Sequence, residues 1–192
     1  DWESLVHTFL AAGNAPVAFL GYAGALLHVL NHGLFKGLLF QGAGAVLGAT
    51  GTREIDLLGG LSRRMPLTAL CFLVGAAAIS GLPPLNGFVS EWLIVVGALR
   101  GAGRLSGSAA VWAVAVVPTI ALIGGLAAAC FVKAYGVVFL GTPRSTAALR
   151  GREAGPTMVG AMVLGALACV AIGLFGAATI RSSLPTTSPS LR

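Results

Sequence analysis

The sequence predicts an all-α protein, a polytopic bundle of transmembrane helices in which one helix is discontinuous. Three observations support this fold class. Of the 192 residues, 56% are hydrophobic and 9% are charged, and the mean hydropathy is +0.91, whereas a soluble domain carries about 25% charged residues. Several apolar windows exceed the ~20 residues that a helix needs to cross a bilayer. One of these windows contains two adjacent prolines, Pro83 and Pro84.

The first fifteen residues are ambiguous, because the apolar run 4–12 is too short to span a bilayer and Gly13-Asn14 breaks it. We interpret residues 1–15 as a loop or as the end of a preceding helix. The chain begins Asp-Trp-Glu, without an initiator Met or a signal-peptide pattern. We therefore expect it to be the later part of a longer protein.

Residues 16–180 are predicted to form a transmembrane domain of about four helices. The first opens with Pro16, a residue favoured at helix starts, and its Gly, Ala and Leu content is typical of packed membrane helices. A polar loop, 49–65, separates it from the second. The predicted helices are 16–48, 66–99, 108–140 and 156–180.

The second helix is predicted to be broken at 81–87. Its two apolar halves, 66–80 and 88–99, are each too short to span a bilayer comfortably. Pro83, Pro84 and Gly87 mark the break, because adjacent prolines remove backbone donors and disfavour helix in the residue before them. Such breaks are tolerated only against protein or a water-filled cavity, and they recur at transporter sites.

We expect a multi-pass protein of the prokaryotic inner membrane, and the distribution of its arginines indicates an orientation. The loops 49–65 and 142–155 hold six arginines and the opposite side holds four, which favours the first side being cytoplasmic. The net charge of +6 is spread over short loops rather than gathered on one face, so we predict no nucleic-acid partner. The tail 181–192, rich in Ser, Thr and Pro, is predicted to be disordered.

Both lysines lie within apolar segments, whereas all ten arginines lie in loops, at segment ends or in the tail. Arginine stays charged at any accessible pH, but a buried lysine can lose its proton. A lysine at membrane depth costs ~2.5 kcal/mol or more on insertion scales, which favours a functional role for Lys36. Lys133 is also a candidate for proton transfer, but it lies near a helix end, so its ammonium could instead extend to the interface.

His28, His32 and Lys36 follow one another at i, i+4 and i+8, so they share one helix face. Imidazole, with a reference pKa of ~6.5, can pass a proton between its two nitrogens. Asn31 and Gln41 of the same helix are candidates for holding water. One alternative is a structural role for the two histidines. A second alternative is metal binding, but no third ligand is nearby, and the three cysteines show no metal-binding spacing. We predict no metal and no cofactor.

Glu91 is the one acid within an apolar segment, just past the predicted break. An acid in the first turn of a helix is stabilised by the helix dipole, so Glu91 has an alternative role as an N-terminal cap. A carboxylate at membrane depth favours proton transfer instead.

These motifs resemble a known family of proton-translocating, antiporter-like membrane subunits. The stretch His28–Phe40 is similar to its H-x-x-x-H-[AG]-x-F-K-[AG]-x-L-F pattern, Ile55–Pro66 resembles the loop that follows, and Gly81–Trp92 resembles its second broken helix. The family includes membrane-arm subunits of complex I, Mrp-type cation/proton antiporters and large membrane subunits of formate-hydrogenlyase-type hydrogenases. The Phe-Val-Ser-Glu-Trp sequence around Glu91 is most similar to that of the hydrogenase-type subunits.

The resemblance implies a subunit of about fourteen helices, of which this chain would be the last four or so. It implies that Lys36 is a central proton-carrying lysine, that His28 and His32 relay protons to it, and that Glu91 is the terminal ionisable residue on the broken helix. The earlier half of the family pattern, with its own Glu–Lys pair, is not in this sequence.

Three functions follow as hypotheses. The first is a non-redox, proton-translocating subunit of an NADH:quinone oxidoreductase-like or hydrogenase-type complex, with no catalytic centre of its own, embedded in the bilayer among other membrane subunits. The second is an Mrp-type cation/proton antiporter subunit that also moves sodium or potassium. The third is a structural membrane subunit that conducts nothing.

Overall fold

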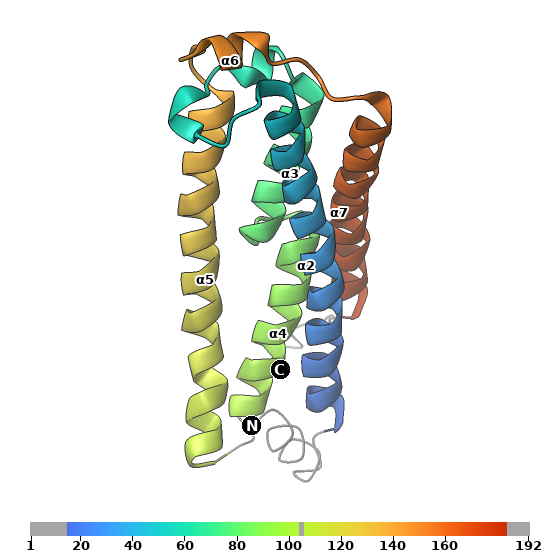
Figure 1. Cartoon of the computed structure of the whole chain (residues 1–192). Coiled ribbons are helices and arrows are strands. Elements are labelled where there is room, and N and C mark those ends of the chain that lie inside the picture. The colour runs from blue at the N-terminus through green and yellow to red at the C-terminus, as the bar shows by residue number, and fades with distance from the viewer. Residues whose placement is uncertain (1–14, 104–105, 184–192) are drawn as a thin grey trace, which may run out of the picture.

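The computed structural model describes residues 15–103 and 106–183, and every regular element in these residues is a helix, which confirms the all-α class. The predictions for residues 1–14 and for 184–192 lie outside the described residues. The elements are α2 (Ala15–Thr50), η1 (Ile55–Leu57), η2 (Leu61–Arg63), α3 (Pro66–Ile79), α4 (Asn86–Ala102), α5 (Ser108–Phe139), α6 (Thr146–Arg150) and α7 (Pro156–Ser183). The long helices stand side by side, with η1, η2 and α6 gathered at one end (Figure 1).

The segment between α3 and α4 interrupts the second apolar stretch. α3 fills the half of the bundle near the short helices and α4 the other half (Figure 1). Gly81, at φ +66°, turns the chain at the end of α3, and the Leu82 N–H donates to Ala77 O at 3.1 Å, a pattern common at helix ends. α4 begins at Asn86, so Asn86 and Gly87 are helical rather than part of the break. The proline pair lies between the two helices.

α7 packs tightly against this interruption. Gly173 has no side chain, and a Cβ placed there would lie 2.6 Å from the Leu85 carbonyl carbon and against Pro84 O. The neighbouring core cluster consists of Phe35, Ala78, Leu85 and Cys169. Because the obstructing atoms are backbone, only glycine permits this approach.

α5 stands at one edge of the described bundle (Figure 1). None of its most apolar 18-residue window is buried, and Trp112, Leu122 and Val132 are exposed. α5 and the Pro156–Gly176 part of α7 are long and apolar enough to cross a bilayer. An apolar helix surface of this extent requires a lipid or protein environment.

The loops at the end that carries α6 are tied together by side chains of one segment. The Arg144 guanidinium donates to Asp56 O at 3.0 Å and to Val137 O at 2.5 Å. The Ser145 hydroxyl donates to Leu57 O at 2.6 Å. These bonds join the 51–65 loop to the segment that follows α5.

Glu153 caps α3 from a distant part of the chain. Its carboxylate accepts from the Leu67 N–H at 2.9 Å and from the Thr68 hydroxyl. These groups belong to the first turn of α3, where unpaired N–H groups and the helix dipole favour an anion. Glu153 therefore fixes the helix that leads into the interruption.

We expect Glu153→Gln to lower the free energy of unfolding by about 1–2 kcal/mol, because hydrogen bonds to charged groups are the stronger class. Thermal unfolding of the purified protein in detergent measures this change. Glu54→Gln is the matched control, because Glu54 is exposed in the loop and its carboxylate accepts no hydrogen bond among the described residues. Equal stability of the two variants would contradict the cap.

Candidate functional site

The predicted proton-transfer residues on α2 meet α4 through one hydrogen bond. His28 Nδ1 lies 3.1 Å from Ser90 Oγ. His28 is half-buried and Ser90 is completely buried. The two helices lie side by side along the half of the bundle that α4 occupies (Figure 1). His28, the first of the three predicted residues on α2, is therefore in direct contact with the helix that carries Glu91.

A pair of asparagines holds the same two helices together. Asn31 Nδ2 donates to Asn86 O at 2.8 Å, and Asn86 Nδ2 donates to Asn31 Oδ1 at 3.0 Å. Both residues are 0% exposed, and Asn86 Oδ1 has no partner among the described residues. Buried amides that bond reciprocally fix one register between two helices.

His32 and Lys36 continue along α2 on the same side. The His28 and His32 ring centroids are 6.0 Å apart, and buried Phe35 packs edge-on to His32 at 5.2 Å. His32 and Lys36 are exposed, and Lys36 Nζ lies 6.0 Å from the Phe40 ring centroid, the outer limit of a cation–π contact.

Glu91 is not an N-terminal cap. α4 begins at Asn86, which makes Glu91 its sixth residue, and no acid lies in its first turn. Its carboxylate instead lies against Gly81 across the interruption, where a Cβ would lie 3.2 Å from Glu91 Cδ. The break and the carboxylate are therefore in contact.

The structure leaves Lys133 apart from this group. Lys133 is exposed on α5, and between residues 15 and 103 and between 106 and 183 no ion pair joins either lysine to Glu91. In the same ranges no three His, Cys, Asp or Glu side chains lie together as a metal site would need.

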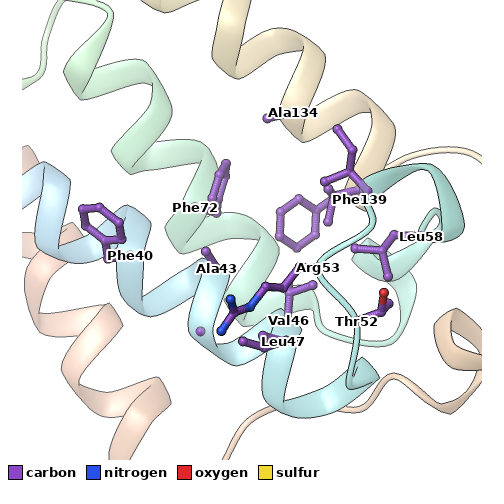
Figure 2. A pocket seen from close by; sticks show the side chains of 13 residues that line it. Phe40, Ala43, Val46, Leu47, Thr52, Arg53, Leu58, Phe72, Ala134 and Phe139 are labelled. Carbon is purple, nitrogen blue, oxygen red and sulfur yellow. The ribbon is translucent and has the colours of Figure 1, made fainter.

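An apolar groove of about 580 Å³ continues the Lys36 side of α2 toward the loops. Figure 2 shows Phe40, Ala43 and Leu47 of α2 on one wall, with Phe72 of α3 and Phe139 of α5 opposite them. Arg53 extends over the groove from the loop (Figure 2). At 100° per residue, Phe40, Ala43 and Leu47 all point within about 40° of Lys36, so the lysine and the groove share one face.

The comparison with known proteins identifies the family of this chain. The model of the family described as NADH:quinone oxidoreductase/Mrp antiporter, transmembrane, matches residues 7–124, more than half of the chain. The chain belongs to this family. It is accordingly an integral membrane protein, as its composition predicts.

The antiporter-family relatives are much longer than this chain. Hydrogenase-4 component B of Escherichia coli K12 is 48% identical over 157 residues, which cover 81% of this chain and 23% of that protein. Formate hydrogenlyase subunit 3 of the same organism is 40% identical over 170 residues, covering 86% and 27%. The chain thus spans about a quarter of the length of these relatives. In fold it is similar to a chain of the Mrp complex from Dietzia sp. DQ12-45-1b, with a TM-score of 0.68 at 22% identity, over 86% of this chain and 36% of that one.

Two polar residues of this antiporter-family segment, Asn86 and Ser90, were not predicted from the sequence as part of the candidate site. Both lie within the motif Gly81–Trp92, but neither was assigned a role. Their i, i+4 spacing places them on one face of α4, opposite His28 and Asn31 of α2. Polar residues at this spacing in an apolar helix were the sequence signal that could have identified them.

Proposed function

We propose that this chain forms part of a proton-translocating subunit of an NADH:quinone oxidoreductase-like or hydrogenase-type membrane complex. The observation that carries the proposal is the hydrogen bond between His28 and Ser90, which joins the α2 residues to the helix that bears Glu91. Protons would move along His28, His32 and Lys36 on α2, and Glu91 would be the ionisable group at the interruption. The chain would supply no redox centre.

The exposure of Lys36 supports a partner on that face. A lysine near the middle of a transmembrane helix is costly against lipid, and such residues face a bundle interior or a water-filled cavity. Because Lys36 shares its face with the groove of Figure 2, we infer that further membrane helices of the complex cover both. Their contact would let water and protons reach the lysine while excluding lipid.

We expect Glu91→Gln to lower proton uptake several-fold, because glutamine keeps the size of the side chain but cannot bind and release a proton. The measurement is proton uptake by energised inverted vesicles that contain the full-length protein in its complex. Glu54→Gln, in the exposed loop, is the control. Uptake that survives Glu91→Gln unchanged would favour the structural role.

The same vesicles separate proton pumping from cation exchange. A proton-translocating subunit takes up protons at the same rate whether or not sodium or potassium is present. Dissipation of the pH gradient that depends on either cation would replace the proposal with a cation/proton antiporter.

A further inference from the structure

The hydroxyl group that links α2 to α4 has more than one possible acceptor. Ser90 Oγ lies 3.1 Å from His28 Nδ1, 3.0 Å from Gly87 O and 3.4 Å from Asn86 O. Ser90 is 0% exposed, so solvent does not compete for it. A hydroxyl carries one proton and can donate to only one of these acceptors, while its oxygen can also accept.

Two arrangements satisfy the distances. In the first, Ser90 donates to His28 Nδ1, and the proton of the neutral imidazole is on Nε2; this makes one hydrogen bond. In the second, His28 Nδ1–H donates to Ser90 Oγ and the Ser90 hydroxyl donates to Gly87 O, which makes two. Because buried polar groups are nearly always paired, the second arrangement, with one more bond, is favoured.

We propose that Ser90 is a positioning residue that holds the proton of neutral His28 on Nδ1 and leaves Nε2 as the nitrogen that accepts an incoming proton. When Nε2 takes up a proton, His28 has two N–H groups and the Nδ1–H bond to Ser90 is kept. The same acceptor therefore serves both charge states of the ring, and no hydrogen bond is broken as the proton arrives.

The asparagine pair keeps this hydroxyl within reach of the ring. Asn86 precedes Ser90 by one turn of α4, and Asn31 follows His28 by nearly one turn of α2. Their two reciprocal bonds, at 2.8 and 3.0 Å, lie beside the His28–Ser90 contact and are fully buried. If the helices slid far enough to separate Ser90 from His28, both hydrogen bonds between the asparagines would have to break.

The position of the proton can be measured directly by ¹⁵N solid-state NMR of histidine-labelled, full-length protein in its membrane, at a pH where His28 is neutral. Subtracting the spectrum of His28→Gln identifies the His28 signals. We expect a protonated Nδ1 in the wild type and a protonated Nε2 in Ser90→Ala. Loss of the hydrogen bond shifts the ratio of the two tautomers about five- to tenfold.

Two further variants control this experiment. Ser90→Thr keeps the hydroxyl and is expected to keep the Nδ1 proton. Ser80→Ala removes a half-buried hydroxyl that donates to Ala76 O at 2.8 Å at the end of α3, and it is expected to leave His28 unchanged. An unprotonated Nδ1 in the wild type, or the same tautomer with and without the Ser90 hydroxyl, would overturn the proposal.

Only the use of Nε2 as a proton acceptor rests on the proposed function; the tautomer does not. If Ser90→Ala moves the proton to Nε2 while Lys36 variants pump normally, the positioning role of Ser90 is confirmed and the proposed proton translocation is overturned. If Lys36 variants fail to pump while the His28 tautomer is the same with and without the Ser90 hydroxyl, the proposed proton translocation is supported and the positioning role of Ser90 is overturned.

Discussion

Replacing Lys36 by alanine is expected to lower proton uptake at least about a hundredfold, the scale on which a single positioned proton carrier acts. Lys36 lies two turns from His28 on a continuous helix, and its ammonium has no ion-pair partner among the described residues, so its removal leaves no buried counter-charge behind. Proton uptake by energised vesicles measures the effect, with the amount of assembled complex determined in parallel.

Lys36→Arg distinguishes a proton carrier from a fixed positive charge. Arginine keeps the charge but does not release its proton, and the exposed position has room for the larger group. We expect this variant to fail as well, whereas Arg150→Ala, a change at an exposed cation at the end of α6, should pump normally. Normal pumping by Lys36→Arg would mean that the charge alone matters and that no proton passes through this residue.

Gly173→Leu is expected to prevent assembly of the bundle. Any side chain at this position meets the backbone of Pro84 and Leu85, because a Cβ would lie 2.6 Å from the Leu85 carbonyl carbon and closer still to Pro84 O. Backbone atoms cannot move aside as a flexible side chain can. Overpacking of this kind costs at least about 1–3 kcal/mol for methylene-sized changes in cores, and a whole leucine exceeds that. The amount of protein that is monodisperse after extraction in detergent measures the loss.

The control for this substitution lies on the same helix. Gly160 is exposed on α7 and a Cβ there meets nothing within 4 Å. Gly160→Leu should therefore be tolerated, and it gains helix propensity. If both variants assembled equally well, the close approach of α7 to the interruption would not matter for the fold.

The fold class and the candidate residues on α2 could be predicted because they depend on local sequence. A run of apolar residues and an i, i+4, i+8 series define a membrane helix and one of its faces regardless of what packs nearby. Pro83 and Pro84 indicate an interruption because proline changes its own backbone and that of its neighbour.

The contacts between distant segments could not be predicted in this way. The Asn31–Asn86 pair, the His28–Ser90 bond and the Glu153 cap each join residues at least 55 positions apart. Nothing in either local sequence specifies the partner. Glu91 was assigned to a first turn because the start of α4 was placed too late; Asn86 and Gly87 are already helical.

The bonds that tie the loops at the α6 end hold the loop that follows α2, so a tilt of α2 would turn about its last residue. Lys36 and His28 lie 14 and 22 residues before Thr50, where α2 ends, or about 21 and 33 Å along the axis. A tilt of about 5° around this end would move Lys36 by about 2 Å and His28 by about 3 Å. Since a hydrogen bond is lost over about 0.5 Å, the His28–Ser90 contact, which lies far from that end, is the first part of the proposed proton path that a tilting helix would open.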